Sequence, residues 1–427
     1  MNEIESNSID RFRQFKKEIR GSKDHLIVGL DIAKRKHHGF LGDANGRTLL
    51  KGLIVENCAE GFRHLLTQVR FYMDREGLSR VVFGLEPTSV YHKPLAEHLI
   101  EQGHLVVYAT NEAIKKNRSL LNGRWDKNDT KDSSNVADLV AQGKCHYYDL
   151  PDMRLRDLRS LLLFRKRLKK QLHSCRVRIR NNLVAQYFPE LDRFWNNAEA
   201  ANLAIVRWFL DPRSIRQLSC EQFMAKVTPH NGGLRQQRRL RQIWEVAEHS
   251  IGCRPGPAMQ LEAELLVETL QSVQAQLGRV EKAIEHLAEG FEEYDYLKSI
   301  PGFGPYVSAM ALAAIGNPYR FENRAQLIRL AGLDLSANRS GEKSKTAVPV
   351  ISKKGKADLR YALYQAALIA SSLTTHFRDY YNRLLEGRQR EKGIRTKMRV
   401  KIAAKMLVIA WTLMKRKEPF NPAFIQS

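Results

Sequence analysis

The sequence is poor in cysteine and has no long apolar run. Its five cysteines are odd in number and lie far apart, at Cys58, Cys145, Cys175, Cys220 and Cys253. Such usage excludes a disulfide scaffold and a zinc finger and is typical of a reduced protein. No apolar run approaches the ~20 residues that span a bilayer, and the charged N-terminus lacks the apolar core of a signal peptide. We therefore expect a soluble, cytoplasmic protein with no membrane partner.

Acidic residues are also scarce relative to basic ones. The chain has 46 Asp and Glu against 70 Lys and Arg, which gives a formal net charge of +24 and a pI near 9.9. So large a surplus predicts a polyanionic partner, because each neutralised phosphate releases condensed counterions. The alternative is a basic surface that only confers solubility. A length of 427 residues, at about 150 residues per domain, suggests roughly three domains.

The first third of the chain predicts a mixed α/β sheet. Strand-like runs lie at 25–34, on both sides of the hairpin signal Asn45-Gly46, at 80–86 and at 104–110. Helical spacing appears at 58–77, 87–103 and 135–143, and a polar stretch precedes the last of these. The order βββαβαβα, antiparallel at first and parallel later, describes a mixed sheet with helices on its faces.

The rest of the chain predicts helices. Residues 152–187 are typical of one long, densely basic helix, and 259–291 of a second with coiled-coil spacing. The segment 190–258 between them is predicted to be an irregular helical insertion, and the C-terminal third is predicted to be mainly helical to Lys417. The predicted segments are 1–24 (an N-terminal extension), 25–150 (an α/β domain), 151–292 (a coiled-coil region containing the insertion) and 293–427 (a helical C-terminal domain).

Four acids are placed where a metal site can form. Asp31 ends the first strand and Glu86 ends the fourth, while Asp129 and Asp132, three residues apart, open the next helix on one of its faces. The first and fourth strands are neighbours in a sheet of this order, so these acids can converge. Clustered carboxylates suit hard divalent cations, and two such ions can position the attacking and leaving oxygens of a phosphate. The alternative is solvated strand ends and a helix-capping acid.

Two further motifs lie in the C-terminal third. IPGFGP at 300–305, ahead of a small-residue helix, looks like a helix-hairpin-helix element in which Gly302 and Gly304 present backbone N–H groups to phosphate. An ordinary glycine turn is the alternative. Ser340 lies in a basic loop without a nearby histidine, so no hydrolase-type triad is predicted there. From the residues alone this loop is a phosphate-contacting segment. Its basic residues are Arg339, Lys343 and Lys345, followed by Lys353 and Lys354.

Together these motifs resemble a known family. The acids in VGLDIAK, GLEPT and KNDTKD, followed by IPGFGPYVSAMALAAIG, the AGL and SG of the loop, and ISKKGKADLRYALYQAA, resemble the DEDD transposases of bacterial insertion sequences, recombinases guided by a bridge RNA. The resemblance covers about 25–145 and 293–415. Three features depart from the family pattern: Asn128 replaces the threonine of KTD, Leu335 replaces a proline, and the middle insertion is long.

The resemblance implies an RNase H/RuvC-like N-terminal domain, a coiled-coil middle and a C-terminal transposase domain. It implies a catalytic, metal-binding tetrad of Asp31, Glu86, Asp129 and Asp132, with Mg²⁺ (two ions per site, Mn²⁺ as the alternative), and Ser340 as nucleophile, with Ser336 and Ser344 as fallbacks. The implied partners are DNA, a guide RNA and further copies of the chain in a dimer or tetramer, associated with the nucleoid. We also expect the long basic helix to contact phosphates through Arg165, Lys166, Arg167, Lys169 and Lys170. A metal-only RuvC-like nuclease and a non-catalytic nucleic-acid-binding protein are the other hypotheses.

Overall fold

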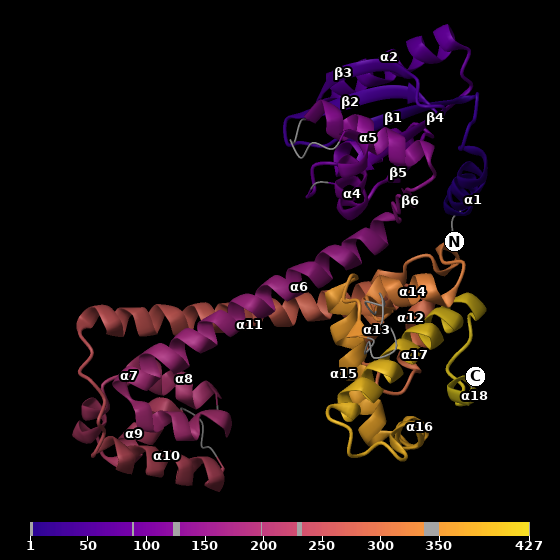
Figure 1. The fold of residues 1–427 in the computed structure, drawn as a ribbon. Helices are drawn as coiled ribbons and strands as arrows, with labels where there is room; N and C mark the ends of the chain where they lie inside the picture. Colours follow the sequence, from indigo (N-terminus) through magenta and orange to yellow (C-terminus); the bar gives the residue numbers. More distant parts are fainter. Residues whose placement is uncertain are drawn as a thin grey trace. The chain divides into compact units, whose positions relative to one another are not determined.

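The protein divides into two compact units, Met1–Asp152 and Met153–Ser427 (Figure 1). The computed structural model describes residues 3–87, 89–122, 129–197, 199–228, 233–336 and 350–426. The first unit is an α/β unit and the second is almost entirely helical. The predicted boundaries at 151 and 293 remain predictions, although the first lies beside the division between the units.

The first unit is built on a six-stranded mixed sheet. Its strands are β1 (His25–Asp31), β2 (Lys36–Asp43), β3 (Thr48–Glu56), β4 (Arg80–Glu86), β5 (Leu105–Tyr108) and β6 (His146–Tyr147), in the order β3-β2-β1-β4-β5-β6. The first three strands form an antiparallel meander, β4 and β5 run parallel to β1, and β6 is antiparallel to β5. The antiparallel start and parallel continuation confirm the predicted mixed sheet.

The predicted hairpin turn joins β2 to β3. Gly46 has a φ of +87°, a left-handed conformation that glycine adopts without steric cost. Asp43 Oδ1 accepts hydrogen bonds from the backbone N–H groups of Asn45 and Arg47, both at 2.9 Å. The Asn-Gly signal is therefore confirmed, and the Asp43 side chain closes the turn.

Helices cover both faces of this sheet. Leu26, Val28 and Leu30 of β1 pack with α2 (Ala59–Glu76) and α3 (Lys93–Glu101). Ile27 of β1 and Val82 of β4 pack on the other face, with α1 (Glu3–Glu18), α4 (Asn111–Asn122) and α5 (Asp129–Ala141). Alternate residues of a strand point to opposite faces, so each buried strand contributes to two cores.

Three details of this unit differ from the expectation. Residues 1–24, for which no helix or strand was predicted, contain α1, which brings Phe15 into the core, and Ile19, just after it, is fully buried. The polar stretch before α5 contains the helix α4, whose few apolar residues include the buried Ile114. The two-residue strand β6 is too short to leave an alternating pattern in the sequence.

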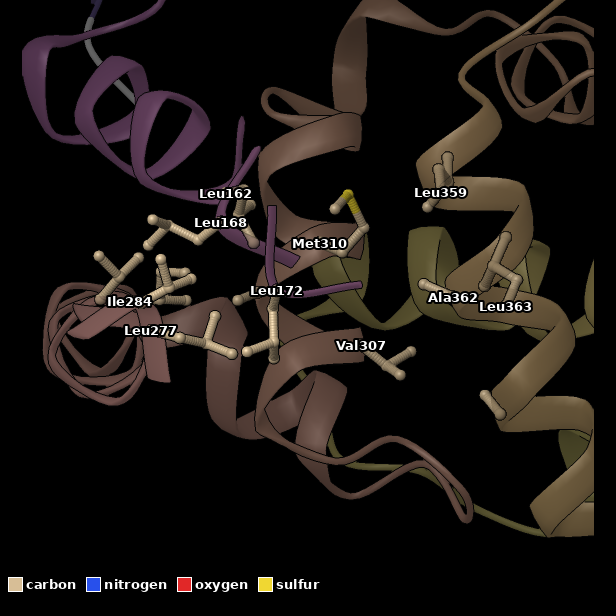
Figure 2. Packing of buried hydrophobic residues seen from close by; sticks show 14 of the residues in the cluster. Leu162, Leu168, Leu172, Leu277, Ile284, Val307, Met310, Leu359, Ala362 and Leu363 are labelled. Atoms are coloured by element: carbon tan, nitrogen blue, oxygen red, sulfur yellow. The ribbon is translucent and has the colours of Figure 1, made fainter. Parts of the chain in front are cut away.

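Two long helices run through the second unit. The first is α6 (Met153–Val177), which continues through a π-helical segment (Arg178–Val184) into α7 (Ala185–Tyr187); the second is α11 (Pro257–Glu289). Figure 2 shows Leu162, Leu168 and Leu172 of α6 against Leu277 and Ile284 of α11. The spacing of three and four residues in both helices confirms the predicted long helical pair.

Shorter helices complete the second unit. The predicted helical insertion contains α8 (Glu199–Trp208), α9 (Cys220–Val227) and α10 (Leu234–Ala247), with 3₁₀ turns at Pro189–Asn197 and Pro212–Gln217. The C-terminal part contains α12 (Glu292–Lys298), α13 (Pro305–Ile315), α14 (Arg324–Ala331), α15 (Ala357–Leu373), α16 (Thr375–Leu385), α17 (Ile394–Arg416) and α18 (Ala423–Gln426). Val307 and Met310 of α13 lie between the long helices and α15 (Figure 2). The mainly helical prediction for this region is confirmed.

Candidate active site

Asp31 and Glu86 are direct neighbours across two parallel strands. In the β1–β4 ladder, Asp31 is the register partner of Glu86, as Gly29 is of Gly84. Adjacent strands lie about 4.8 Å apart, and both acids are the last residues of their strands. Both are partly exposed. The backbone register therefore places these two acids side by side at one edge of the sheet.

Both acids lie on the sheet face that carries α5. Along β1, Ile27, Gly29 and Asp31 alternate with the residues that face α2 and α3, and the buried Ile27 packs in the core that α5 contributes to. Side chains two and four residues apart on a strand share a face. The carboxylate of Asp31, and by its register that of Glu86, therefore emerges beside the N-terminal end of α5.

Two glycines allow α5 to lie directly on the sheet. A Cβ atom on Gly29 would collide with the backbone oxygen of Ser133, and one on Gly84 would lie 2.6 Å from Val140 Cγ2. Such approaches are closer than close-packed atoms allow. The Gly-Leu-acid pattern at the end of β1 and of β4 therefore has a physical reason, because each glycine makes room for the helix that begins beside the acid.

Asp132 is buried in the first turn of α5 and paired with an arginine. Its residue exposure is 1%, and its Oδ1 lies 2.6 Å from Arg118 Nη2 on α4. Asn117, the residue before Arg118, donates from Nδ2 to Asn135 Oδ1 and to Asp138 Oδ2 of α5, both at 2.7 Å. This buried network ties α4 to α5 and so holds Arg118 against Asp132.

Asp129 is the first residue of α5, and its side chain lies outside the described residues. Among the side chains that the structure describes, no three His, Cys, Asp or Glu residues are grouped closely enough to hold a metal ion. The donor chemistry of the adjacent Asp31 and Glu86 fits a hard divalent cation, because both supply carboxylate oxygens, whereas Asp132 is held by Arg118.

Sequence reasoning missed two residues beside these acids. His38 of β2 is the register partner of Asp31 on the side opposite Glu86, and Arg118 belongs to a helix that was not predicted. The preceding His37 is fully buried and points the other way; burial lowers its pKa, and its Nδ1 accepts from the Ala33 N–H at 3.3 Å. The pair His37-His38 at the start of a strand was the available signal.

Ser340, Ser344, Arg339, Lys343 and Lys345 lie outside the described residues, as does the Ser336 side chain. Backbone pairing and a side-chain hydrogen bond fix the chain at 334–336 and at 350–352, on the two sides of the loop that contains Ser340. Leu335 and Ser336 pair antiparallel with Ile351 and Val350. Ser352 Oγ donates to Asp334 Oδ1 at 2.6 Å. Lys353 and Lys354 follow and are exposed.

The two glycines of IPGFGP have different surroundings. Gly302 has a φ of +90°, and a Cβ atom there would lie 2.6 Å from the Ala366 backbone oxygen of α15. Gly304 has open space around its Cα and precedes α13 directly. Gly302 therefore has a packing role in the turn, whereas Gly304 stays available for the predicted phosphate contact.

The basic residues of α6 also divide into two kinds. Arg165 lies seven residues from both Leu158 and Leu172, a seam position, and is bound to Glu281 of α11 at 2.7 Å with its guanidinium 3.9 Å from the Tyr306 ring centroid. Lys166 pairs with Asp358 at 2.9 Å. Arg167, Lys169 and Lys170 are exposed. The phosphate contacts remain a prediction, and Arg165 is the one of these five residues whose side chain is mostly buried.

No helix in the described part of the chain is both long and apolar enough to cross a membrane. The fold and site define a basic protein with paired acids at the edge of a mixed sheet and a helical second unit. Residues 28–189 match the DEDD transposase family of IS110 elements, and residues 294–382 match the family described as transposase IS116/IS110/IS902. The chain belongs to this IS110/IS116 family of DEDD transposases.

Two individual relatives match nearly the whole chain. The uncharacterized 44.8 kDa protein of insertion element IS116 from Streptomyces clavuligerus is 23% identical over 412 residues, covering 94% of this chain and 97% of that protein. The uncharacterized 43.6 kDa protein of IS110 from Streptomyces coelicolor is 24% identical, covering 91% and 94%. A third relative, the transposase for IS1111A from Coxiella burnetii, is 26% identical over 44% of this chain and 52% of that protein.

Proposed function

We propose that this transposase is a site-specific DNA recombinase that moves its own insertion element with a metal-binding acidic tetrad and a serine nucleophile. The observation that carries the proposal is the pairing of Asp31 with Glu86 at the end of two parallel strands, with Asp132 on the helix that covers the same face. The family match supplies the reaction class, the cutting and rejoining of DNA.

We assign the first unit to the RNase H/RuvC-like fold. The support is the sheet itself: an antiparallel β1–β2–β3 meander, β4 and β5 parallel to β1, and acids at the ends of β1 and β4. In this assignment Asp31, Glu86, Asp129 and Asp132 form the catalytic tetrad. The fold alone does not specify the activity, so the chemistry is argued from the acids.

The four carboxylates would hold Mg²⁺, with two ions per site and Mn²⁺ as the alternative. When bound, such ions neutralise charge that develops on the phosphate and orient its oxygens. The chain's own contribution is positional: Gly29 and Gly84 let α5 approach the sheet, and the α4–α5 network fixes the first turn of α5. Because Arg118 is bound to Asp132, that carboxylate is neutralised without a metal.

Ser340 would attack the scissile phosphorus. The Ser340 Oγ–P bond forms, the bond from phosphorus to the departing DNA oxygen breaks, and the proton lost by the serine ends on that oxygen. Reversal of the attack by a hydroxyl of another strand reseals the backbone and frees Ser340, so no ATP is needed. The strand pairing at the two ends of this loop supports its role. Leu335–Ser336 pairs with Val350–Ile351 and so brings the ends of the loop together.

The proposed partners are the DNA of the element ends and target, a structured guide RNA, and further copies of the chain in a dimer or tetramer. The support for nucleic-acid partners is the net charge of +24 and the exposed Arg167, Lys169 and Lys170. The long helices α6 and α11 would serve in assembly, and the protein would act at the nucleoid.

The experiment separates a recombinase from a nuclease. Wild type, Ser340→Ala and Asp31→Asn are incubated with element-end DNA, guide RNA and Mg²⁺, and the products are run on a denaturing gel. We expect a covalent protein–DNA adduct with wild type only. Binding should persist in both variants, because it comes from the basic surface.

Two outcomes would contradict the proposal. Free cut ends from Ser340→Ala, within about a hundredfold of the wild-type rate, would mean that Ser340 only donates a hydrogen bond worth about 1–3 kcal/mol. The chain would then be a metal-dependent RuvC-like nuclease. Binding without cutting by wild type under every metal and RNA condition would favour a non-catalytic nucleic-acid-binding protein.

A further inference from the structure

A cleft of about 790 Å³ lies in the first unit beside α5. One wall is α5 itself, from Ser134 to its end, and the other is the turn between β2 and β3. Arg20 and Gly21, just after α1, close one side. The cleft lies on the same sheet face as Asp31, because Phe40 in its floor packs in the core that contains α5.

The rim of the cleft is basic. Four exposed cations line it: Arg20, Arg47, Lys51 and Lys144. Arg47 is paired with Glu76 at 2.9 Å. Arg20 donates from Nε to the Gln142 backbone oxygen at 3.0 Å, and because that oxygen is neutral, the contact does not compensate the charge of Arg20. Four cations against two acids, Asp43 and Asp138, give the lining a positive balance, and such a balance attracts polyanions.

The two acids in the lining are engaged within the protein. Asp43 Oδ1 accepts from the N–H groups of Asn45 and Arg47. Asp138 Oδ2 accepts from Asn117 Nδ2 and from Gln142 Nε2, at 2.7 and 2.8 Å. These carboxylate oxygens are therefore occupied by turn and helix contacts, while the rim cations are exposed to solvent.

The floor of the cleft is apolar and consists of two alanine side chains and one phenylalanine ring. Phe40, Ala44 and Ala137 are at most 9% exposed and lie in the lining together with Asn45 and Gln142. An apolar floor under a basic rim suits bases below and phosphates above, the arrangement of single-strand binding grooves.

We infer that this cleft binds a segment of single-stranded DNA that continues along α5 from the acidic site. Ser134, at one end of the cleft, is two residues from Asp132, and Gln142, just past the end of α5, lies eight residues further along, roughly 12 Å away. A strand that runs from the acids along α5 passes Ser134 first and then reaches the β2–β3 turn, because Asp43 lies opposite Leu26 at the start of β1, five residues before Asp31. The inference rests on the proposed function, since it takes the acids as the place where DNA is cut.

The test compares two triple variants of the full chain, each losing three exposed cations. The cleft variant is Arg20→Gln, Lys51→Gln and Lys144→Gln. The control is Arg63→Gln, Arg70→Gln and Lys93→Gln, on α2 and α3 across the sheet. Both are made in an Asp31→Asn background and measured in EDTA with a fluorescent oligothymidylate, so that no cleavage occurs and the result is independent of Ser340.

We expect the cleft variant to bind the oligonucleotide at least about tenfold more weakly at low salt. Its log Kd against log salt slope should fall by about two, because each lost single-strand phosphate contact removes about 0.7. The control should keep the wild-type slope. Photo-crosslinking of an iodouracil-containing strand to wild type should label the peptide containing Phe40 or Ala137.

Equal losses in the two variants, or crosslinks confined to other peptides, would overturn the inference. Single-stranded RNA of matched sequence bound more than tenfold tighter than DNA would overturn the choice of DNA. The proposed function fails separately, through the absence of a covalent adduct with wild-type protein.

Discussion

Arg118 and Asp132 form an ion pair in which the carboxylate is almost completely shielded from water. Arg118 Nη2 lies 2.6 Å from Asp132 Oδ1, and the side chains are 25% and 2% exposed. A buried carboxylate without a counter-ion is costly. The arginine from α4 therefore supplies the positive charge that a divalent cation would supply when bound.

Replacing Arg118 should make the first unit dependent on a divalent cation. Arg118→Ala leaves Asp132 buried and unpaired, and we expect the free energy of unfolding to fall by about 3 kcal/mol in EDTA. Mn²⁺ should restore much of this loss, because it replaces the missing charge. Thermal unfolding with and without Mn²⁺ measures both effects.

Lys116→Ala is the control on the same helix, since Lys116 forms an exposed pair with Glu112 at 3.2 Å. Exposed pairs contribute about 1 kcal/mol or less. An equal Mn²⁺-induced rise in Tm for both variants would show that Arg118 and the metal do not share Asp132.

Gly29→Ala should abolish cleavage although it replaces none of the acidic residues. The new Cβ atom would meet the backbone oxygen of Ser133, which cannot move unless α5 shifts. Gly84→Ala should be milder, because its Cβ atom would meet the Val140 side chain at 2.6 Å. We expect Gly29→Ala to lose more cleavage activity than Gly84→Ala. Thermal unfolding of both variants measures the strain.

Gly278→Ala, which has open space on α11, should stabilise its helix by up to about 1 kcal/mol.

Arg165 should behave as a packing residue and Arg167 as a surface residue. Arg165 contacts both Glu281 and the Tyr306 ring, so Arg165→Gln should cost about 1–3 kcal/mol of stability. Arg167→Gln should leave Tm unchanged and lower the salt dependence of nucleic-acid binding. Differential scanning calorimetry and binding at several salt concentrations would distinguish them; identical profiles would refute the division.

The buried His37 should make the first unit less stable in acid. Burial lowers its pKa below the ordinary value of 6.5, so the unfolded chain takes up a proton that the folded chain does not. Stability is therefore lost as pH falls from about 6.5 toward the folded pKa. His37→Gln should weaken the fall in Tm between pH 7.5 and 5.5, whereas His64→Gln, exposed on α2, should not. His25 and His104, whose pKa values are also lowered by burial, would account for the remaining slope.

The sequence by itself determined the sheet, the long helices and the positions of Asp31 and Glu86 at strand ends. These follow from local patterns: buried runs that end on an acid, an Asn-Gly turn, and leucines spaced by three and four residues. Such patterns predict an element because it must bury one face, whichever other element that face packs against. The family resemblance came from the same residues and is confirmed by the matches over 28–189 and 294–382.

Only the tertiary structure decided which charges meet. Arg118 lies 14 residues before Asp132, and Arg165 lies 116 residues before Glu281; no periodicity links such residues. The helix α4 escaped prediction because it has few apolar residues, and its buried Asn117 is satisfied by α5 rather than by solvent. The cleft beside α5 likewise exists only where the β2–β3 turn folds next to that helix, because a concave surface needs walls from distant parts of the chain.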